Sequence, residues 1–213
     1  KINFIIIIMN KQICILDYDC GNTKSLINVF KKLSIKCILT NEKEKIKESS
    51  HFILPGVGSF KTAVEKFKNY VPEELLKTEI FEKKKPILGI CVGMQIMATE
   101  GNEFKKTMGL NWIEGKVEKM KNKKFPLPHV GWNNVTQKVK SNLFKNIETD
   151  TDFYFLNSFA FNTKRNDDIL AISIYENKFI SAIRKNNIFG LQFHPEKSQK
   201  AGRKLLSNFV EYY

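Results

Sequence analysis

A cysteine between two glycines is the strongest chemical signal in the sequence. The apolar segment Pro86–Ile90 is typical of a buried strand, and Gly-Ile-Cys-Val-Gly at residues 89–93 leads from it into an apolar segment with helical spacing. Flanking glycines permit the tight strand-to-helix turn of a nucleophile elbow. The helix N-terminus favours the thiolate of Cys91, and the N–H of Val92 can donate to an oxyanion. Alone, the pentapeptide fits a nucleophile and a buried structural cysteine equally well.

A histidine and a glutamate two residues apart follow an apolar strand near the end of the chain. Side chains at i and i+2 of an extended segment point the same way, and Pro195 favours that conformation at His194. Glu196 can therefore orient the imidazole of His194, which can serve Cys91 as a base in a catalytic triad. Each residue alone also fits a structural role, but together with the elbow they favour catalysis.

A third segment, Pro-Gly-Val-Gly-Ser at residues 55–59, follows the strand expected at His51–Leu54. Its glycines allow backbone N–H groups to approach a ligand. Its spacing matches neither GxGxxG nor GxxxxGK[ST], so a phosphate site is not indicated. On spacing alone it is an ordinary turn.

Alternating strands and helices must position these three segments. In the first half we expect strands at 12–17, 35–39, 51–54 and 86–90, and helices at 24–33, 59–70, 72–84 and 92–100. In the second half we expect strands at 112–120, 135–139, 153–156, 169–175, 179–184 and 188–193, and a helix at 199–210. The prediction is an α/β fold with a mostly parallel central sheet flanked by helices and an additional antiparallel or mixed strand region. Residues 12–213 form one domain, and residues 1–11 are an N-terminal extension or the start of the first strand.

The composition excludes several classes of protein. The chain has 213 residues, 42% hydrophobic and 12% aromatic, which argues against disorder and low complexity. A formal net charge of +13 raises a nucleic acid or a membrane surface as a partner. Only three of the 35 basic residues are arginines, the side chains that bind phosphates and base edges in a bidentate way, and the lysines are scattered. We therefore expect a solvated basic surface and no nucleic-acid or membrane partner.

The cysteines indicate a reduced chain, which predicts a cytoplasmic protein. They form no CxxC pair, and no histidine lies near them at a zinc-finger spacing; they are Cys14, Cys20, Cys37 and Cys91. The apolar stretch Phe4–Met9 is too short to span a bilayer.

The motifs together resemble those of the class I glutamine amidotransferases, Cys-His-Glu glutaminases that release ammonia from glutamine for a synthase. Residues 89–95 and 193–196 carry this resemblance. Within the family, the chain is most similar to the branch of glutaminase subunits of imidazole glycerol phosphate synthase. The turn at 55–58, the run Pro-Leu-Pro-His-Val-Gly-Trp-Asn at 126–133 and the ending at 193–209 favour that branch. The resemblance covers about residues 13–209.

The resemblance implies a mechanism and a partner. Cys91 would attack the side-chain amide of glutamine, and His194 with Glu196 would transfer the protons. Backbone N–H groups of Val92 and of the Gly56-Val57 turn would bind the oxyanion, while Gly58 and Gln95 would position glutamine. No metal or organic cofactor is implied. A (β/α)₈-barrel cyclase would form a heterodimer with the chain and use the ammonia to make imidazole glycerol phosphate and aminoimidazole carboxamide ribotide in histidine biosynthesis.

One position departs from the pattern. Asn157 stands before Ser158 where the family usually has histidine. This keeps open a paralogous glutaminase that supplies ammonia to a sugar-modifying amidotransferase. A cysteine peptidase-like hydrolase and a catalytically silent binding module are two further alternatives.

Overall fold

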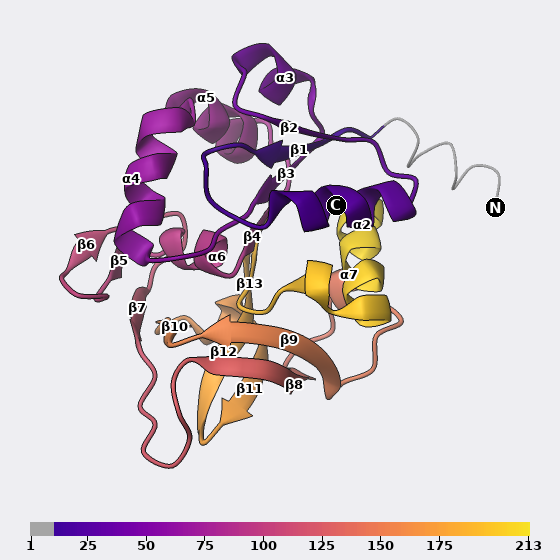
Figure 1. The fold of residues 1–213 in the computed structure, drawn as a ribbon. Helices are drawn as coiled ribbons and strands as arrows, with labels where there is room; N and C mark the ends of the chain where they lie inside the picture. The colour runs from indigo at the N-terminus through magenta and orange to yellow at the C-terminus, as the bar shows by residue number, and fades with distance from the viewer. Residues whose placement is uncertain (1–10) are drawn as a thin grey trace.

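Residues 11–213 are described by a computed structural model, in which a nine-stranded mixed sheet runs through the molecule (Figure 1). Its strands are β1 (Ile13–Leu16), β2 (Cys37–Thr40), β3 (His51–Leu54), β4 (Ile87–Ile90), β8 (His129–Gln137), β9 (Thr151–Asn157), β11 (Ile169–Tyr175), β12 (Asn177–Lys185) and β13 (Ile188–Leu191). Their order is β2-β1-β3-β4-β13-β12-β11-β8-β9. The pairs from β2 to β13 are parallel, and those from β13 to β9 are antiparallel.

A smaller sheet lies beside the large one. Its order is β10 (Phe159–Asn162), β7 (Lys116–Lys119), β5 (Glu100–Gly101) and β6 (Thr107–Met108). β10 follows β9 after a single residue, so the chain passes from the large sheet directly into the small one.

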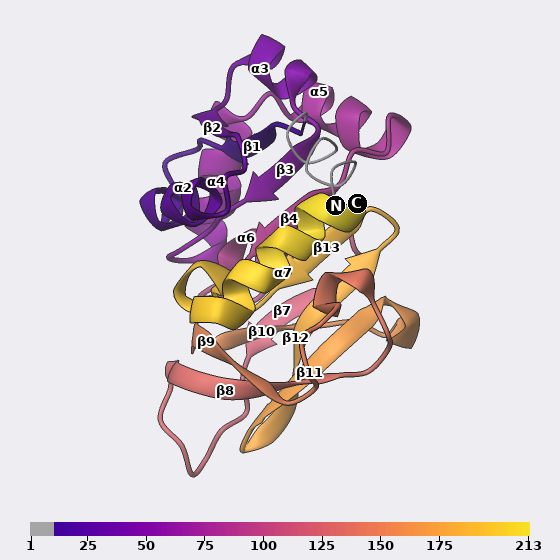
Figure 2. The ribbon, with the colours of Figure 1, turned by 90° about the vertical axis from the view of Figure 1, so that its right-hand side faces the viewer.

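Helices cover both faces of the parallel strands. They are α2 (Thr23–Lys32), α3 (Lys43–Glu48), α4 (Phe60–Tyr70), α5 (Glu73–Lys77), the π-helix η1 (Thr78–Glu82), α6 (Val92–Ile96) and α7 (Gln199–Tyr212), with 3₁₀ turns η2 (Asn142–Phe144), η3 (Asn166–Asp168) and η4 (Pro195–Lys197). In Figure 1, α4 and α5 lie on one side of the parallel strands, and α2 and α7 on the other. Figure 2 shows α7 running along β4 and β13, where the ring centroids of Phe209 and Phe189 are 5.8 Å apart.

Because helices cover both faces of the parallel strands, only the ends of these strands can contact a ligand. Every residue of β1, β3, β4 and β13 is buried, as is usual for parallel strands covered on both faces. In such sheets, ligands bind where the loops leave the carboxyl ends of the strands. The loops after β1, β3, β4 and β13 lead to Asp17, Pro55, Cys91 and Gln192, so three of them carry the segments singled out in the sequence.

The predicted α/β fold with a mixed strand region is confirmed. Most predicted strands and helices are present within a few residues, and Ser59 caps α4 by accepting from Thr62 N–H. The division at residue 12 stays a prediction, because residues 1–10 lie outside the described residues. Within residues 11–213, no helix is both long enough and apolar enough to cross a membrane.

The helix predicted at 92–100 is wrong in its length, because α6 ends at Ile96. The carbonyls of Ile96, Met97 and Ala98 accept hydrogen bonds from backbone N–H groups of residues 110–113, and Glu100 already belongs to β5. The apolar residues up to Ala98 are buried because this crossing segment packs into the core. The apolar residues therefore continue beyond the end of α6, and this continuation is why the sequence predicted a longer helix.

Several other boundaries also differ from the prediction. The helix expected at 72–84 is divided into α5 and η1. The strand expected at 112–120 is reduced to β7, because the N–H groups of Trp112 and Ile113 donate to Met97 O in a turn. β8 begins at His129, earlier than predicted. The sequence did not indicate α3, whose only buried residue is Ile46, or the short strand β10.

Candidate active site

Cys91 lies at the sharp junction between β4 and α6. Its backbone has φ +53° and ψ −114°, which a non-glycine residue rarely adopts and which costs about 1–3 kcal/mol. The junction is held in place by hydrogen bonds from Cys91 N–H to Leu191 O (2.7 Å) and from Gln95 N–H to Cys91 O (3.1 Å). The strained turn predicted for a nucleophile elbow is therefore present.

The glycine that follows the elbow is required by close packing. A Cβ atom at Gly93 would overlap the carbonyl oxygen of Leu54 at the end of β3, and one at Gly56 would overlap the backbone nitrogen of Gly93. The elbow and the turn after β3 thus touch through their backbones. This contact places the residues 55–58 directly beside Cys91.

Replacing Gly93 by alanine should therefore destabilise the fold by about 3 kcal/mol, the upper range for overpacking a rigid site. Gly58→Ala is the matched control, because Gly58 has φ +88° but no atom within 4 Å of a built Cβ. The control should lose only about 1 kcal/mol from backbone strain. Urea unfolding of both variants measures the difference, and equal losses would contradict the packing argument.

A pocket of about 210 Å³ opens at the elbow. It contains six of the predicted site residues: Val57, Gly58, Cys91, Val92, Gln95 and His194. Its other lining residues are Glu103, Pro128, Leu156, Asn157, Ser158 and Phe159. The two remaining predicted residues do not line the pocket. Gly56 packs against the backbone of Gly93, and Glu196 contacts Nδ1 of the His194 imidazole.

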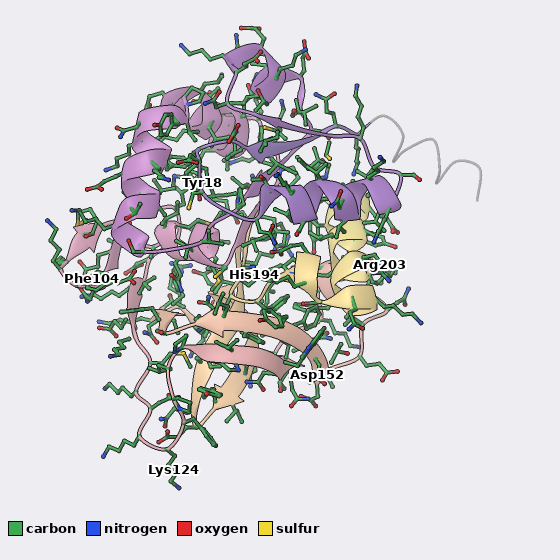
Figure 3. The ribbon with its side chains drawn as sticks, viewed as in Figure 1. Tyr18, Phe104, Lys124, Asp152, His194 and Arg203 are labelled. Carbon is green, nitrogen blue, oxygen red and sulfur yellow. The ribbon has the colours of Figure 1, made fainter. Side chains whose placement is uncertain are left out.

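His194 is held between a carboxylate and the thiol. Its side chain is labelled near the centre of the molecule in Figure 3 and is 1% exposed. Nδ1 lies 2.8 Å from Glu196 Oε1, and Nε2 has no hydrogen-bond partner of regular geometry among the described residues. Burial by itself lowers the pKa of His194, but the contacts with Cys91 and Glu196 outweigh it and raise the pKa to about 10. The imidazole therefore favours its charged form beside the thiol at neutral pH.

This raised pKa predicts a pH-dependent stability. A folded-state pKa of about 10 against the ordinary 6.5 means that the stabilisation of His194 is complete below about pH 6.5 and is lost as the pH rises through about 10. Glu196→Gln should therefore lower the free energy of unfolding most near pH 6 and least near pH 10.5. Urea unfolding at both pH values, with Glu148→Gln at an exposed carboxylate as the control, tests this. A loss that is independent of pH would contradict it.

Gln95 and Gln192 form a buried amide pair beneath the thiol. Gln95 Nε2 donates to Phe159 O (3.0 Å) and to Gln192 Oε1 (2.9 Å), and Gln192 Nε2 lies 3.8 Å from Cys91 Sγ. Gln95 thus lines the pocket, and its amide nitrogen already donates to two acceptors; its role in positioning glutamine stays a prediction. Gln192 was missed, although it stands two residues before His194 and so points to the same side of the strand.

The carboxylate of Glu103 is a second residue that the sequence did not reveal. It lines the pocket from the loop after β5, and its Oε2 accepts from Phe60 N–H at 2.6 Å at the start of α4. It is the acidic residue among the pocket-lining residues, so it can bind a positively charged group of a ligand. Glu103 lies in a loop without helical or strand periodicity, so no sequence pattern predicts that it belongs to the site.

Asn157, the position that departs from the family pattern, lines the pocket at the end of β9. Its Nδ2 donates to Phe159 O (3.1 Å) and contacts Met120 Sδ (3.2 Å), and the side chain is 6% exposed. Opposite it on β8 stands His129, which stacks on Tyr175 with ring centroids 4.0 Å apart. Burial lowers the pKa of His129 to about 4, so its ring is neutral and packs as an aromatic side chain.

No group of three histidine, cysteine or acidic side chains within residues 11–213 is arranged to hold a metal ion. All four cysteines are free thiols.

The chain belongs to the class I glutamine amidotransferase family: the family description "Glutamine amidotransferase class-I" matches residues 14–212. The family resemblance seen in the motifs is therefore confirmed. Among its relatives, imidazole glycerol phosphate synthase subunit HisH 2 of Methanococcus maripaludis is 40% identical over 201 residues, which cover 94% of this chain and 99% of the relative. The subunit HisH of Leptospira interrogans is 40% identical over 203 residues, which cover 93% and 99%.

Solved structures share the fold at lower identity. The structure of PurLQS from Thermotoga maritima aligns with a TM-score of 0.72 and 17% identity over 96% of this chain and 99% of the other. A further glutamine amidotransferase aligns with a TM-score of 0.72 and 18% identity over 93% and 97%. These similarities support the arrangement of sheet and helices described above.

Proposed function

We propose that this chain is the glutaminase subunit of an imidazole glycerol phosphate synthase and works through the triad Cys91, His194 and Glu196. The observation that carries the proposal is that Cys91 and His194 line one pocket while Glu196 binds the far side of the imidazole. The names of the relatives, which the chain matches over nearly their whole length, support this synthase in particular.

In this mechanism Cys91 Sγ attacks the side-chain carbonyl carbon of glutamine. Backbone N–H groups of Val92 and of the turn at Gly56-Val57 bind the oxyanion, a contribution of about 3 kcal/mol for each donor. His194, oriented by Glu196, protonates the leaving ammonia, and the γ-glutamyl thioester forms. His194 then takes a proton from water, which attacks the thioester and releases glutamate and the free thiol.

The rest of the pocket supports binding of glutamine as an amino acid. The carboxylate of Glu103 suits the α-ammonium group, and Gly58 and Gln95, which line the same pocket, would position glutamine. Glu103 and Cys91 are separated in the sequence, but both line the same cavity and can contact one ligand.

An apolar surface beside the pocket supports docking of a synthase subunit. Val130 and Trp132 on β8 stand opposite Leu156 and Tyr154 on β9, and the first three are 56%, 47% and 38% exposed. Leu156 also lines the pocket, so this surface reaches its rim. Exposed apolar groups that border a functional site mark protein interaction surfaces. We place a (β/α)₈-barrel cyclase here, in a cytoplasmic heterodimer that makes imidazole glycerol phosphate and aminoimidazole carboxamide ribotide.

The function is tested by mixing the chain with the cyclase subunit and its ribotide substrate. Glutamine should be hydrolysed and imidazole glycerol phosphate should form in equal amounts. Glutamine hydrolysis without this product, but with amidation of a sugar in the presence of a sugar-modifying synthase, would favour the second candidate that Asn157 keeps open. Family membership argues against a peptidase, and the intact triad argues against a silent binding module.

A further inference from the structure

The amide of Gln192 is a buried group beside the nucleophile that the triad mechanism does not use. Its side chain is 0% exposed, and its Nε2 lies 3.8 Å from Cys91 Sγ, within the distance of a hydrogen bond to sulfur. Gln192 directly follows β13, which pairs in parallel with β4 up to the residue before Cys91. The strand pairing that positions the elbow therefore also brings this amide to the thiol.

A chain of hydrogen bonds fixes which end of the Gln192 amide faces the sulfur. Phe159 O is a backbone carbonyl and can only accept, so the amide of Gln95 must turn its Nε2 towards it, at 3.0 Å. The same nitrogen donates to Gln192 Oε1 at 2.9 Å, which leaves Nε2 of Gln192 for the sulfur. The amide therefore presents a donor, and not an acceptor, to Cys91 Sγ.

The two polar contacts of the sulfur favour opposite protonation states. The thiol can donate to Leu156 O, which lies 3.7 Å away, whereas a thiolate has no proton to donate there. The N–H group of Gln192 binds more strongly to a charged sulfur than to a neutral one. A hydrogen bond to the charged form of a group favours that form. Of these two contacts, the one with Gln192 thus favours the nucleophilic form of Cys91.

We propose that Gln192 is a further catalytic residue of the glutaminase site, because its Nε2–H donates to the thiolate of Cys91, and that Gln95 is the residue that positions it. This inference rests on the proposed function and deepens it. On ionisation the thiol proton passes to Nε2 of His194, while the amide of Gln192 keeps both of its protons. When the sulfur bonds to the amide carbon of glutamine, its negative charge passes to the oxyanion. Gln192 therefore acts on the nucleophile before attack.

Several titratable groups surround the sulfur, and an exchange of Gln192 leaves all of them in place. They are His194, Glu196 on the far side of its imidazole, Glu103 in the catalytic pocket, and Tyr18, which interacts electrostatically with Cys91. Gln192→Met keeps the length of the side chain and removes one neutral donor without changing any charge. A difference in the ionisation of Cys91 between this variant and the wild type therefore reports the lost hydrogen bond.

Alkylation of Cys91 by iodoacetamide as a function of pH tests the proposal on the full chain. The peptide that contains Cys91 is quantified by mass spectrometry, because the other three cysteines are also free thiols. In Gln192→Met the pH of half-maximal alkylation should rise by about one unit, a tenfold change in the thiolate equilibrium. In Gln95→Met the amide of Gln192 keeps its donor but loses the partner that orients it, so the rise should be smaller.

Asn208→Leu is the matched control. Asn208 on α7 is another amide with 0% exposure, its Nδ2 donates to Leu143 O and Lys145 O, and it does not line the catalytic pocket. The control loses buried hydrogen bonds as Gln192→Met does, so its melting temperature should fall. Its alkylation profile should nevertheless match that of the wild type, because nothing near the sulfur has changed.

The outcomes separate this inference from the proposed function. An unchanged midpoint in Gln192→Met, or an equal rise in Asn208→Leu, would overturn the inference and leave the proposed function intact. If Gln192→Met does not fold, an unchanged midpoint in Gln95→Met would overturn it in the same way. Glutamine hydrolysis with the cyclase subunit is measured on the same samples. Its absence in the wild type would overturn the proposed function, and the catalytic role of Gln192 with it, whatever the alkylation profiles.

Discussion

Cys91→Ala is expected to reduce glutamine hydrolysis by at least about 10⁴-fold, the scale of effect seen when a triad nucleophile is removed. Cys91 is the thiol that lines the pocket with His194, and alanine removes the sulfur that attacks the amide carbon of glutamine. The side chain makes only weak contacts, 3.7 Å to Leu156 O and 3.8 Å to Gln192 Nε2. Alanine at this position should therefore keep the fold and the backbone of the elbow.

Ammonia release from glutamine, measured with the cyclase and its substrate present, tests this expectation. The control is synthesis of imidazole glycerol phosphate from added ammonium salt, which should be unchanged because it needs only the partner's own site. Hydrolysis of glutamine at the wild-type rate by Cys91→Ala would show that another group is the nucleophile. Loss of the ammonium-dependent reaction would point to a damaged complex.

Trp132→Ala is expected to weaken binding of the cyclase subunit at least about 30-fold. Trp132 is the largest exposed side chain of the apolar surface on β8 and β9, and it packs edge-on against Tyr154 at 6.1 Å. A large aromatic side chain at the centre of an interface typically contributes about 2–4 kcal/mol. Its removal should therefore raise the Kd without altering the triad.

The affinity of the two subunits can be measured by titration calorimetry. Tyr70→Ala is the control, because Tyr70 is an aromatic side chain that is 54% exposed at the end of α4, outside β8 and β9. The control should bind as the wild type does. Equal affinity of Trp132→Ala and the wild type would show that the partner docks elsewhere.

The sequence predicted the parts of the site whose determinants are local. The elbow could be recognised because the strand, both glycines and Cys91 stand within a few residues, and only one backbone geometry fits them. His194 and Glu196 could be paired from their spacing, although the predicted extended conformation is wrong beyond His194, because Glu196 lies in the 3₁₀ turn η4 and contacts the imidazole from there. The alternation of strands and helices in the first half predicted parallel strands, so the loops after β3 and β4 could be expected at one edge of the sheet. The order of the strands was not predicted, and β13 pairs in parallel with β4 although it follows the antiparallel strand β12.

The parts that were missed depend on contacts between distant segments. Glu103 reaches the pocket from a loop beyond the point where α6 ends, and that end is set by hydrogen bonds from residues 110–113. Gln192 could have been inferred from its spacing to His194, but its pairing with Gln95 could not.

The transfer of ammonia from glutamine to the cyclase is tested most directly by following the amide nitrogen of glutamine. The complex of this chain with the cyclase would be given glutamine labelled with ¹⁵N in the side-chain amide, together with unlabelled ammonium ions in the buffer. The imidazole glycerol phosphate formed by the wild type should carry the label, and the product formed with Cys91→Ala should not. Unlabelled product from the wild-type complex, or labelled product from the variant, would contradict it.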